Sequence, residues 1–422
     1  MVILNDLQRI ALQQMIDGKN IFLTGGAGTG KSTIISEFKK YLENTSKQYI
    51  ICAPTGIASI NIEGVTLHRA FKIPLGPILE KPKFIPQILK DIECIIIDEI
   101  SMVRIDVFEY VASMIINTNK FRQKNCMPMI QVIVCGDFFQ LPPVITENDR
   151  EVLEKFAYSN LRKGFAFESP MWSIFNFLFI ELNEVVRQSD YNFISALHNI
   201  RIGNKNAISW FNNACSNVEQ KDAILVCGTN KKADEKNKFE LDKIANEKKW
   251  VFKSEITGVV NENDKVAPDV IELKVGCRVM VLINDTIDDE YQNGSLGYVT
   301  KITKDEVTVK IDEGNTVVIT RNTWKIENYK GETNSKGKVS VSKETIGTYT
   351  QFPLKLGYAV TIHKSQGKTF DKANIDPWCW DCGQLYVALS RVRTIQGLSL
   401  MSPIQPRCLV CDYDVKRFYN YI

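Results

Sequence analysis

Residues 25–33 read GGAGTGKST, a glycine-rich stretch that ends in Lys, Ser and Thr. Gly25, Gly30, Lys31 and Ser32 complete the pattern of a phosphate-binding loop. The apolar run 21–23 precedes the loop and the helical pattern 34–38 follows it, so the loop joins a buried strand to a helix. Backbone N–H groups of such a loop turn toward phosphate oxygens, and the positive end of the following helix adds to the attraction.

We therefore expect a nucleoside triphosphate to bind here. Lys31 would reach the β- and γ-phosphates, and the Ser32 hydroxyl would ligate Mg²⁺. The residues expected to contact the nucleotide in this loop are Gly25, Gly26, Ala27, Gly28, Thr29, Gly30, Lys31, Ser32 and Thr33.

Two further strand ends carry polar residues. The run 94–99 reads CIIIDE, in which Asp98 would hold Mg²⁺ and Glu99 would orient and deprotonate the attacking water. A polar strand end without chemistry is the alternative, and the complete phosphate-binding loop disfavours it. The run 136–143 reads GDFFQLPP, where Gln140 would hydrogen-bond the γ-phosphate. A structural glutamine in a proline-terminated turn remains the alternative for Gln140.

The first 180 residues alternate short apolar runs with amphipathic stretches. The runs 21–23, 49–52, 95–97 and 132–135 each read as a buried strand that ends in a turn, and helical patterns lie between them. This alternation predicts an α/β fold with a parallel sheet that is covered on both faces.

Three stretches interrupt or follow this pattern. Four prolines, Pro74, Pro77, Pro82 and Pro86, favour an extruded arm over a sheet core. The runs 306–311 and 316–319 predict a hairpin in a small β module. The stretch 231–253, rich in Lys and Glu, predicts a helix with a solvated face.

Length and composition bound the class of protein. The chain has 422 residues, which indicates two to four domains, and 44% of them are hydrophobic. Apolar runs are too short to span a membrane, and the start lacks the pattern of a signal peptide. Eleven cysteines are an odd number, which favours reduced thiols in a cytosol-like compartment. A net charge of +3 permits nucleic-acid binding without arguing for it.

Two arginines stand in apolar settings that read as helical. Arg187 lies in 182–188, LNEVVRQ, and Arg391 in 386–393, YVALSRVR. An arginine that neutralises charge on the transferred phosphate greatly accelerates hydrolysis. If both arginines come from a second lobe of the same chain, ATP would clamp two lobes together and hydrolysis would release them. Spacing alone leaves surface arginines as the alternative.

With these features together, the chain resembles the PIF-type DNA helicases of superfamily 1B, which are close to the RecD-like enzymes. The resemblance covers nearly the whole chain, and the motifs occur in the family's order. After Leu4–Gln8 and GGAGTGKST they are APTGIAS at 53–59, GVTLHRAF at 64–71, IIIDEISM at 95–102, VIVCGDFFQLPPV at 132–144, EVVRQSD at 184–190, TIHKSQGKTF at 361–370 and QLYVALSRVR at 384–393.

The resemblance implies a role for each matching residue. Gln8 would read adenine, Gly367 would contact the nucleotide, and Arg187 and Arg391 would be arginine fingers supplied in cis. The residues expected to line the DNA path are Pro54, Thr55, Gly56, Thr66, His68, Phe71, Thr361, His363, Lys364, Ser365 and Gln366. From the residues alone, Phe71, Phe138 and Phe139 are candidates for stacking on bases, with core packing as the alternative.

The resemblance also implies an architecture of two RecA-like lobes. Residues 1–180 would form the first lobe with a small wedge at 72–88, residues 181–299 and 351–422 the second lobe, and residues 300–350 an SH3-like β insertion. The activity would be ATP- and Mg²⁺-dependent 5′→3′ unwinding of duplex, forked or four-stranded guanine DNA in replication, repair or recombination. The enzyme would act on single-stranded DNA and fork junctions, as a monomer or a DNA-induced dimer. Its compartment would be the cytoplasm, or the nucleus or mitochondrion of a eukaryote.

Two features depart from the family. Tyr358 stands where tryptophan is common, and the segment 377–382, PWCWDC, is unusual. The paired CxxC sequences at Cys379/Cys382 and Cys408/Cys411 are typical of structural zinc. Residues 407–411 read as a strand, however, which would turn Cys408 and Cys411 to opposite faces and disfavours a shared metal.

Two other classes of function are compatible with the sequence. One is a ring-forming P-loop ATPase, which borrows its arginine from a neighbouring subunit. The other is a nucleic-acid-binding module with a vestigial ATP site, which ATP turnover with and without single-stranded DNA would distinguish from a helicase.

Overall fold

The computed structural model describes residues 3–82, 86–159, 161–215, 218–285, 290–312, 314–333 and 339–421. Contacts divide the chain into two compact units. The first comprises the chain up to Arg187 together with Glu327–Thr345, and the second comprises Gln188–Ile326 and the chain from Ile346 onward.

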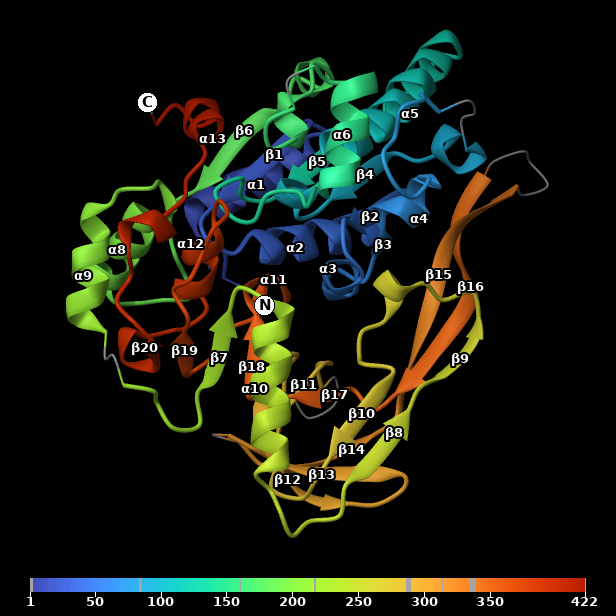
Figure 1. Cartoon of the computed structure of the whole chain (residues 1–422). Coiled ribbons are helices and arrows are strands. Elements are labelled where there is room, and N and C mark those ends of the chain that lie inside the picture. The colour runs from blue at the N-terminus through green and yellow to red at the C-terminus, as the bar shows by residue number, and fades with distance from the viewer. Residues whose placement is uncertain are drawn as a thin grey trace. The chain divides into compact units, whose positions relative to one another are not determined.

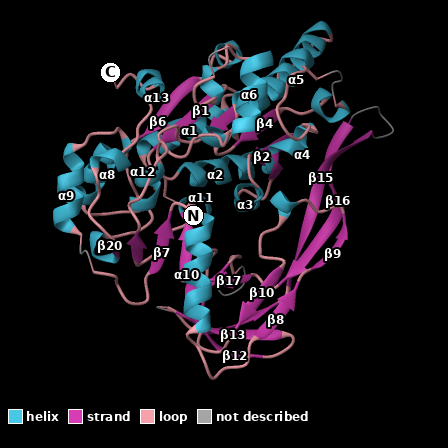
Figure 2. Ribbon diagram, viewed as in Figure 1, coloured by secondary structure: helices cyan, strands magenta, loops and turns pink. Residues whose placement is uncertain are grey.

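The first unit contains a parallel six-stranded sheet with the order β3-β2-β4-β5-β1-β6 (Figures 1 and 2). Its elements are α1 (Asp6–Ile16), β1 (Ile21–Gly25), α2 (Lys31–Asn44), β2 (Tyr49–Ala53), α3 (Gly56–Asn61), β3 (Val65–Thr66), α4 (Leu67–Phe71), β4 (Cys94–Ile97), α5 (Ile105–Lys124), β5 (Gln131–Cys135), α6 (Glu147–Phe156), α7 (Met171–Ile174) and β6 (Leu178–Leu182). Short 3₁₀ turns are η1 (Gln87–Lys90), η2 (Ile100–Met102) and η3 (Ala166–Glu168). The four expected strands are confirmed as β1, β2, β4 and β5.

Side chains alternate between the two faces of each strand, and both faces of this sheet are covered by other elements. On one face, Ile21 and Leu23 of β1 share a core with Ile34 and Phe38 of α2. On the other face, the ring of Phe22 lies 5.4 Å from that of Trp172 in α7. Apolar strands covered on both sides fix the carboxyl ends of β1, β4 and β5 along one edge, where polar residues follow each strand.

The second unit combines a parallel sheet with antiparallel ones. The sheet β18-β7-β19-β20 is parallel, and the sheet β14-β13-β12-β11-β17 is antiparallel. Its elements are α8 (Tyr191–Arg201), α9 (Asn206–Ala214), β7 (Ile224–Cys227), α10 (Asn230–Asp242), β8 (Trp250–Lys253), β9 (Glu255–Gly258), η4 (Glu262–Asp264), β10 (Val270–Leu273), β11 (Arg278–Val281), β12 (Leu296–Ile302), β13 (Glu306–Ile311), β14 (Thr316–Thr320), β17 (Leu354–Leu356), β18 (Ala359–Thr361), α11 (Ile362–Ser365), β19 (Ala373–Ile375), α12 (Gln384–Leu389), η5 (Ile395–Gly397), β20 (Leu398–Leu400), η6 (Pro406–Cys408) and α13 (Tyr413–Phe418).

The structure confirms several smaller expectations. The predicted hairpin is the antiparallel pair β13–β14, in which Val307 lies opposite Ile319. The Lys/Glu-rich stretch contains α10, although β8 occupies its end. The long strands β15 (Asn322–Thr333) and β16 (Val339–Gln351) form a three-stranded sheet with β9. The proline-rich arm is free of regular structure in the described parts of 72–86, and residues 83–85 lie outside them. In the described residues, no helix combines the length and the apolar character that crossing a bilayer requires.

Asn237 fastens α10 to the parallel sheet. Its amide nitrogen donates to the Ala359 carbonyl at 3.0 Å, and its amide oxygen accepts from the backbone N–H groups of Tyr358 and Ala359 at 3.1 and 2.9 Å. One side chain thus satisfies three backbone groups that lie beside the candidate DNA-binding segment.

We predict that Asn237→Ala destabilises the protein by about 1–3 kcal/mol, because these backbone groups lose their partner. Thermal unfolding followed by circular dichroism measures the change. The exposed neighbour Lys238→Ala is the matched control. Equal melting temperatures for the two variants would contradict the assignment.

Candidate active site

The phosphate-binding loop connects β1 to α2 through left-handed backbone. Gly25, Gly28 and Gly30 have φ of +142°, +78° and +85°, a region that favours glycine. The loop is also closely packed, because a Cβ on Gly28 would lie 2.5 Å from the Cβ of Arg187. Gly30 caps the N-terminus of α2, whose first N–H groups are free of helical partners and attract anions.

The Lys31 ammonium folds back over this loop. It donates to the carbonyl oxygens of Gly25 at 2.8 Å and Gly26 at 3.0 Å. These bonds hold the positive charge at the mouth of the loop, which is the place that the predicted role of Lys31 requires.

Asp98 and Glu99 follow β4 at the same edge of the sheet. Asp98 is buried, and its Oδ1 accepts the Glu99 N–H at 2.9 Å. Burial raises the pKa of Asp98, while the hydrogen bond from Glu99 and the charge of Lys31 oppose that rise. Glu99 adopts left-handed backbone, with φ 51° and ψ 45°, which is costly for a residue with a side chain and is typical of functional sites.

Gln140 lies beside Asp137, for which the sequence predicts no role. The Gln140 Nε2 donates to Oδ2 of Asp137 at 3.4 Å, and Asp137 Oδ1 accepts the Phe139 N–H at 3.2 Å. Both side chains are buried. Asp137 thus positions Gln140, and its place directly after Gly136 at the end of β5 was the signal that could have revealed it.

Gln8 forms part of the loop's support. It closes a capping box with Asn5 at the start of α1, and its Nε2 donates to the Thr29 carbonyl at 3.0 Å. Its amide oxygen accepts the Asn5 N–H at 3.0 Å. The adenine contact stays a prediction, and the structure adds that Gln8 orients the phosphate-binding loop.

The expected helical setting of Arg187 is wrong. Arg187 lies in irregular backbone beyond β6 and belongs to the first unit, where Val186 N–H donates to the Gly28 carbonyl at 2.8 Å. The apolar stretch before it is the strand β6, which an apolar run of that length does not distinguish from a helix. Arg187 therefore lies against the phosphate-binding loop, and its role as an arginine finger stays a prediction.

Arg391 lies two residues beyond α12 rather than within a helix. It is buried, and its guanidinium donates to the backbone carbonyls of Ser365 at 3.2 Å and Lys368 at 3.1 Å. Further bonds join it to the Val387 carbonyl at 2.7 Å and to the Ser390 hydroxyl at 2.8 Å. These bonds tie Arg391 to the TIHKSQGK segment within the second unit.

In the first unit, the expected DNA contacts lie at helix starts. The Thr55 hydroxyl caps α3 by accepting the Ala58 N–H at 3.2 Å, and Thr66 precedes α4. Pro54 and His68 are half-buried, whereas Gly56 is buried. Phe71 is fully buried, as are Phe138 and Phe139, so core packing holds for these rings and base stacking does not. An aromatic residue in a motif does not reveal from sequence which way its ring points.

In the second unit, Thr361 caps α11 by accepting the Lys364 N–H at 3.4 Å. Lys364 is exposed, whereas His363 and Gln366 are half-buried. Ser365 is fully buried and its hydroxyl donates to the Ile362 carbonyl at 2.7 Å, which favours a structural role. Thr361 and Lys364 line a hollow of about 360 Å³ together with Lys355. Burial, aided by the charges of Lys368 and Lys364, lowers the pKa of Lys355 to about 7.

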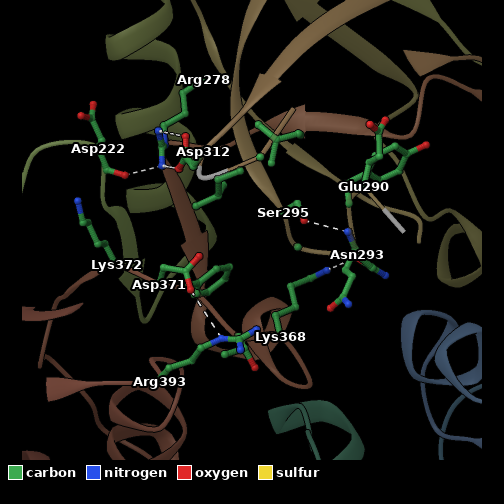
Figure 3. Close-up of a pocket in the computed structure, with 18 of the residues that line it drawn as sticks. Asp222, Arg278, Glu290, Asn293, Ser295, Asp312, Lys368, Asp371, Lys372 and Arg393 are labelled. Carbon is green, nitrogen blue, oxygen red and sulfur yellow. Dashed lines mark hydrogen bonds and ion pairs between the residues drawn. The ribbon is translucent and has the colours of Figure 1, made fainter. Parts of the chain in front are cut away.

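A larger hollow of about 570 Å³ lies in the second unit where Gly367 and Lys368 meet the antiparallel sheet (Figure 3). Its wall holds the ion pair of Arg278 with Asp312 at 2.5 Å, and Lys368 hydrogen-bonds Asn293. Burial lowers the pKa of Lys368 to about 8. The lining carries carboxylates as well as cations, so its charge does not favour an anion.

The expected strand at 407–411 is wrong. Residues Pro406–Cys408 form the 3₁₀ turn η6, which a proline at its first position favours. In the described residues, no group of three or more His, Cys, Asp or Glu side chains is arranged to hold a metal ion.

The donor chemistry of the first unit nevertheless fits Mg²⁺ beside a nucleotide. Ser32 and Asp98 offer the oxygen ligands that Mg²⁺ prefers, and the charge of Lys31 acts on Asp98. When bound, Mg²⁺ neutralises charge that develops on the phosphates.

The phosphate-binding loop and the strand-end carboxylates define a P-loop nucleoside triphosphatase. The family of PIF1-like helicases matches residues 3–210. The ATP-dependent DNA helicase Pif1 of Campylobacter jejuni is 32% identical over 93% of this chain and 90% of its own. Bacteroides sp. Pif1 in complex with ADP-AlF4 matches with a TM-score of 0.84 and 34% identity over 100% of this chain and 97% of its own. Bacteroides Pif1 with ADP-AlF3 and ssDNA matches with a TM-score of 0.68 and 35% identity over 100% of this chain and 97% of its own.

The chain belongs to the Pif1 family of ATP-dependent DNA helicases.

Two histidines of the candidate DNA path respond to pH in the same direction. Burial and the charge of Arg104 lower the pKa of His68, and burial lowers that of His363. Both are therefore neutral at pH 7 and offer hydrogen bonds rather than charge.

We predict that His68 and His363 lower the free energy of unfolding as the pH falls below 6.5, because the unfolded chain takes up protons there that the folded histidines resist. The double variant His68→Gln/His363→Gln should show a shallower decrease in urea titrations between pH 7 and pH 5. His198→Gln, at an exposed position, is the control. Identical pH profiles for the parent protein, the double variant and the His198→Gln control would contradict the prediction.

Proposed function

We propose that this enzyme uses Mg²⁺-dependent ATP hydrolysis to move 5′→3′ along single-stranded DNA and to unwind duplexes and forks. Membership of the Pif1 family supports this, as do the similar structures of Bacteroides Pif1 with single-stranded DNA and of two Pif1 helicases at forked duplex DNA. We further propose that the enzyme unwinds four-stranded guanine DNA and acts in DNA replication, repair or recombination.

The observation that carries the proposal is the bonding of Arg391. Its guanidinium donates to the carbonyls of Ser365 and Lys368, which lie within and just after the segment expected to contact the DNA backbone. If Arg391 exchanges these bonds for a nucleotide phosphate, the segment 361–368 must respond. ATP binding and DNA contact would then be coupled through a few hydrogen bonds.

In the first unit, each residue would have a separate task. Lys31 would neutralise phosphate charge, Glu99 would accept a proton from the attacking water, and Gln140, held by Asp137, would contact the γ-phosphate. Thr55 and His68 would donate hydrogen bonds to DNA phosphates.

We predict that Lys31→Ala and Glu99→Gln each lower ATP turnover by about 100-fold or more, because each removes a group that acts on the reacting phosphate. Both variants should retain binding of single-stranded DNA. Turnover of [γ-³²P]ATP and fluorescence anisotropy of a labelled oligonucleotide measure the two properties. Lys40→Ala, an exposed lysine of the same helix, is the control. Normal turnover in Glu99→Gln would overturn the catalytic assignment.

The direction of movement has a direct test. Duplexes with either a 5′ or a 3′ single-stranded tail should be compared at equal enzyme concentration. We expect unwinding of the 5′-tailed duplex and little of the 3′-tailed one. Unwinding of the 3′-tailed duplex alone would refute the proposed polarity.

A further inference from the structure

Two neighbouring tryptophans lie open to solvent in the second unit. Trp378 and Trp380 are 53% and 50% exposed. The chain has six tryptophans, all within the described segments, and the remaining four are buried or half-buried. Water disfavours such large apolar rings, so two of them exposed in one short loop call for a function.

The loop between β19 and α12 brings these rings to the carboxyl end of β7. The ring of Trp380 lies on Gly228, where a Cβ would be 2.4 Å from its Cζ3 atom. Gly228 follows Cys227, which pairs with Thr361 across β7 and β18. Neighbouring strands are about 4.8 Å apart, so the Trp380 ring lies beside the start of the candidate DNA-binding segment.

Hydrogen bonds to side chains anchor the backbone at both tryptophans. The Trp380 N–H donates to Gln384 Oε1 at 3.1 Å, and the Trp378 N–H donates to Asp376 Oδ1 at 3.3 Å. The absence of a side chain on Gly228 lets the Trp380 ring approach the strand. A ring packed as closely as that of Trp380 loses little conformational entropy when a flat ligand stacks on it.

The charges around the loop suit a polyanion with flat groups. The guanidinium of Arg407 lies 4.8 Å from the centre of the Trp378 ring, and about half of the surface of Trp378 remains exposed. Lys364 is exposed on α11, and Lys232 neutralises the carboxylate of Asp376 at 2.7 Å. Asp381 is the acidic exception, and its charge acts on His363.

We propose that Trp378 and Trp380 form a stacking platform for successive bases of single-stranded DNA. The phosphates of the same nucleotides would lie toward Thr361 and Lys364. Stacking accepts every base, because each has a π-face, so the platform would support movement without sequence preference. The proposal rests on the proposed function and adds a base-binding site to it.

Replacement of each tryptophan by leucine removes the π-face and keeps an apolar side chain. Trp250→Leu is the matched control, because Trp250 is partly exposed in the same unit and has the Lys248 ammonium 4.2 Å from its ring centre. Anisotropy should compare oligothymidylate with an abasic oligonucleotide of equal length, which has the same phosphates and no bases.

Trp378→Leu and Trp380→Leu should each bind oligothymidylate at least about fivefold more weakly than the parent protein. Binding of the abasic strand should not change. Trp378→Phe and Trp380→Phe should recover most of the loss, and Trp250→Leu should show none. In the parent protein, oligothymidylate should quench tryptophan fluorescence, and this quenching should shrink in both leucine variants.

Parent-like affinity of both leucine variants for oligothymidylate would overturn the platform alone. An equal loss on both oligonucleotides would also overturn it, because the tryptophans would then act on the phosphate contacts or on folding. A parent protein that binds neither strand would refute the proposed function together with the platform.

Discussion

The catalytic unit depends on one tight turn of backbone between β1 and α2. Two segments of the chain close on its glycines. A Cβ on Gly25 would meet the Leu182 carbonyl at 2.4 Å, one on Gly28 the Cβ of Arg187 at 2.5 Å, and one on Gly30 the Gln8 amide at 2.5 Å. Residues from α1 and from the end of β6 onward therefore pack the loop into the shape that presents its N–H groups. The anion site is a product of tertiary packing as much as of the glycine pattern.

The same packing explains why residues far from the loop belong to its function. Gln8 and the backbone of Val186 hydrogen-bond the loop from opposite ends of the first unit's sequence. In the second unit, Arg391 supports a different segment in a similar way: it donates to backbone carbonyls of the segment expected to contact DNA. In our account, hydrolysis becomes movement because a few hydrogen bonds to carbonyl oxygens can be exchanged at little net cost.

The fold was predictable from the sequence because two signals agreed along the first 180 residues. Short apolar runs indicated strands that are buried on both faces, and glycine or acidic residues at their ends indicated one functional edge. The predicted roles of Lys31, Asp98 and Glu99 followed from that pattern. The partners that surround each side chain were harder to predict. Leu178–Leu182 and the residues up to Arg187 read equally well as a helix, and only pairing with β1 shows the strand.

Burial was the property that the sequence predicted worst. Phe71 and Ser365 belong to motifs that indicated DNA contact, yet each is fully buried. By contrast, the two exposed rings of Trp378 and Trp380 lie in a segment that the sequence marked only as unusual. Orientation depends on partners distant in the sequence, such as Gly228 for Trp380, and no local pattern contains that information.

The central claim is that one polypeptide supplies both the phosphate-binding loop and the arginine that acts on the nucleotide. Mixing the variants Lys31→Ala and Arg391→Ala tests this directly, with DNA-stimulated ATP turnover as the readout. We expect the mixture to be as inactive as either variant alone. Turnover in the mixture well above the sum of the separate proteins would instead show that a neighbouring copy supplies the arginine.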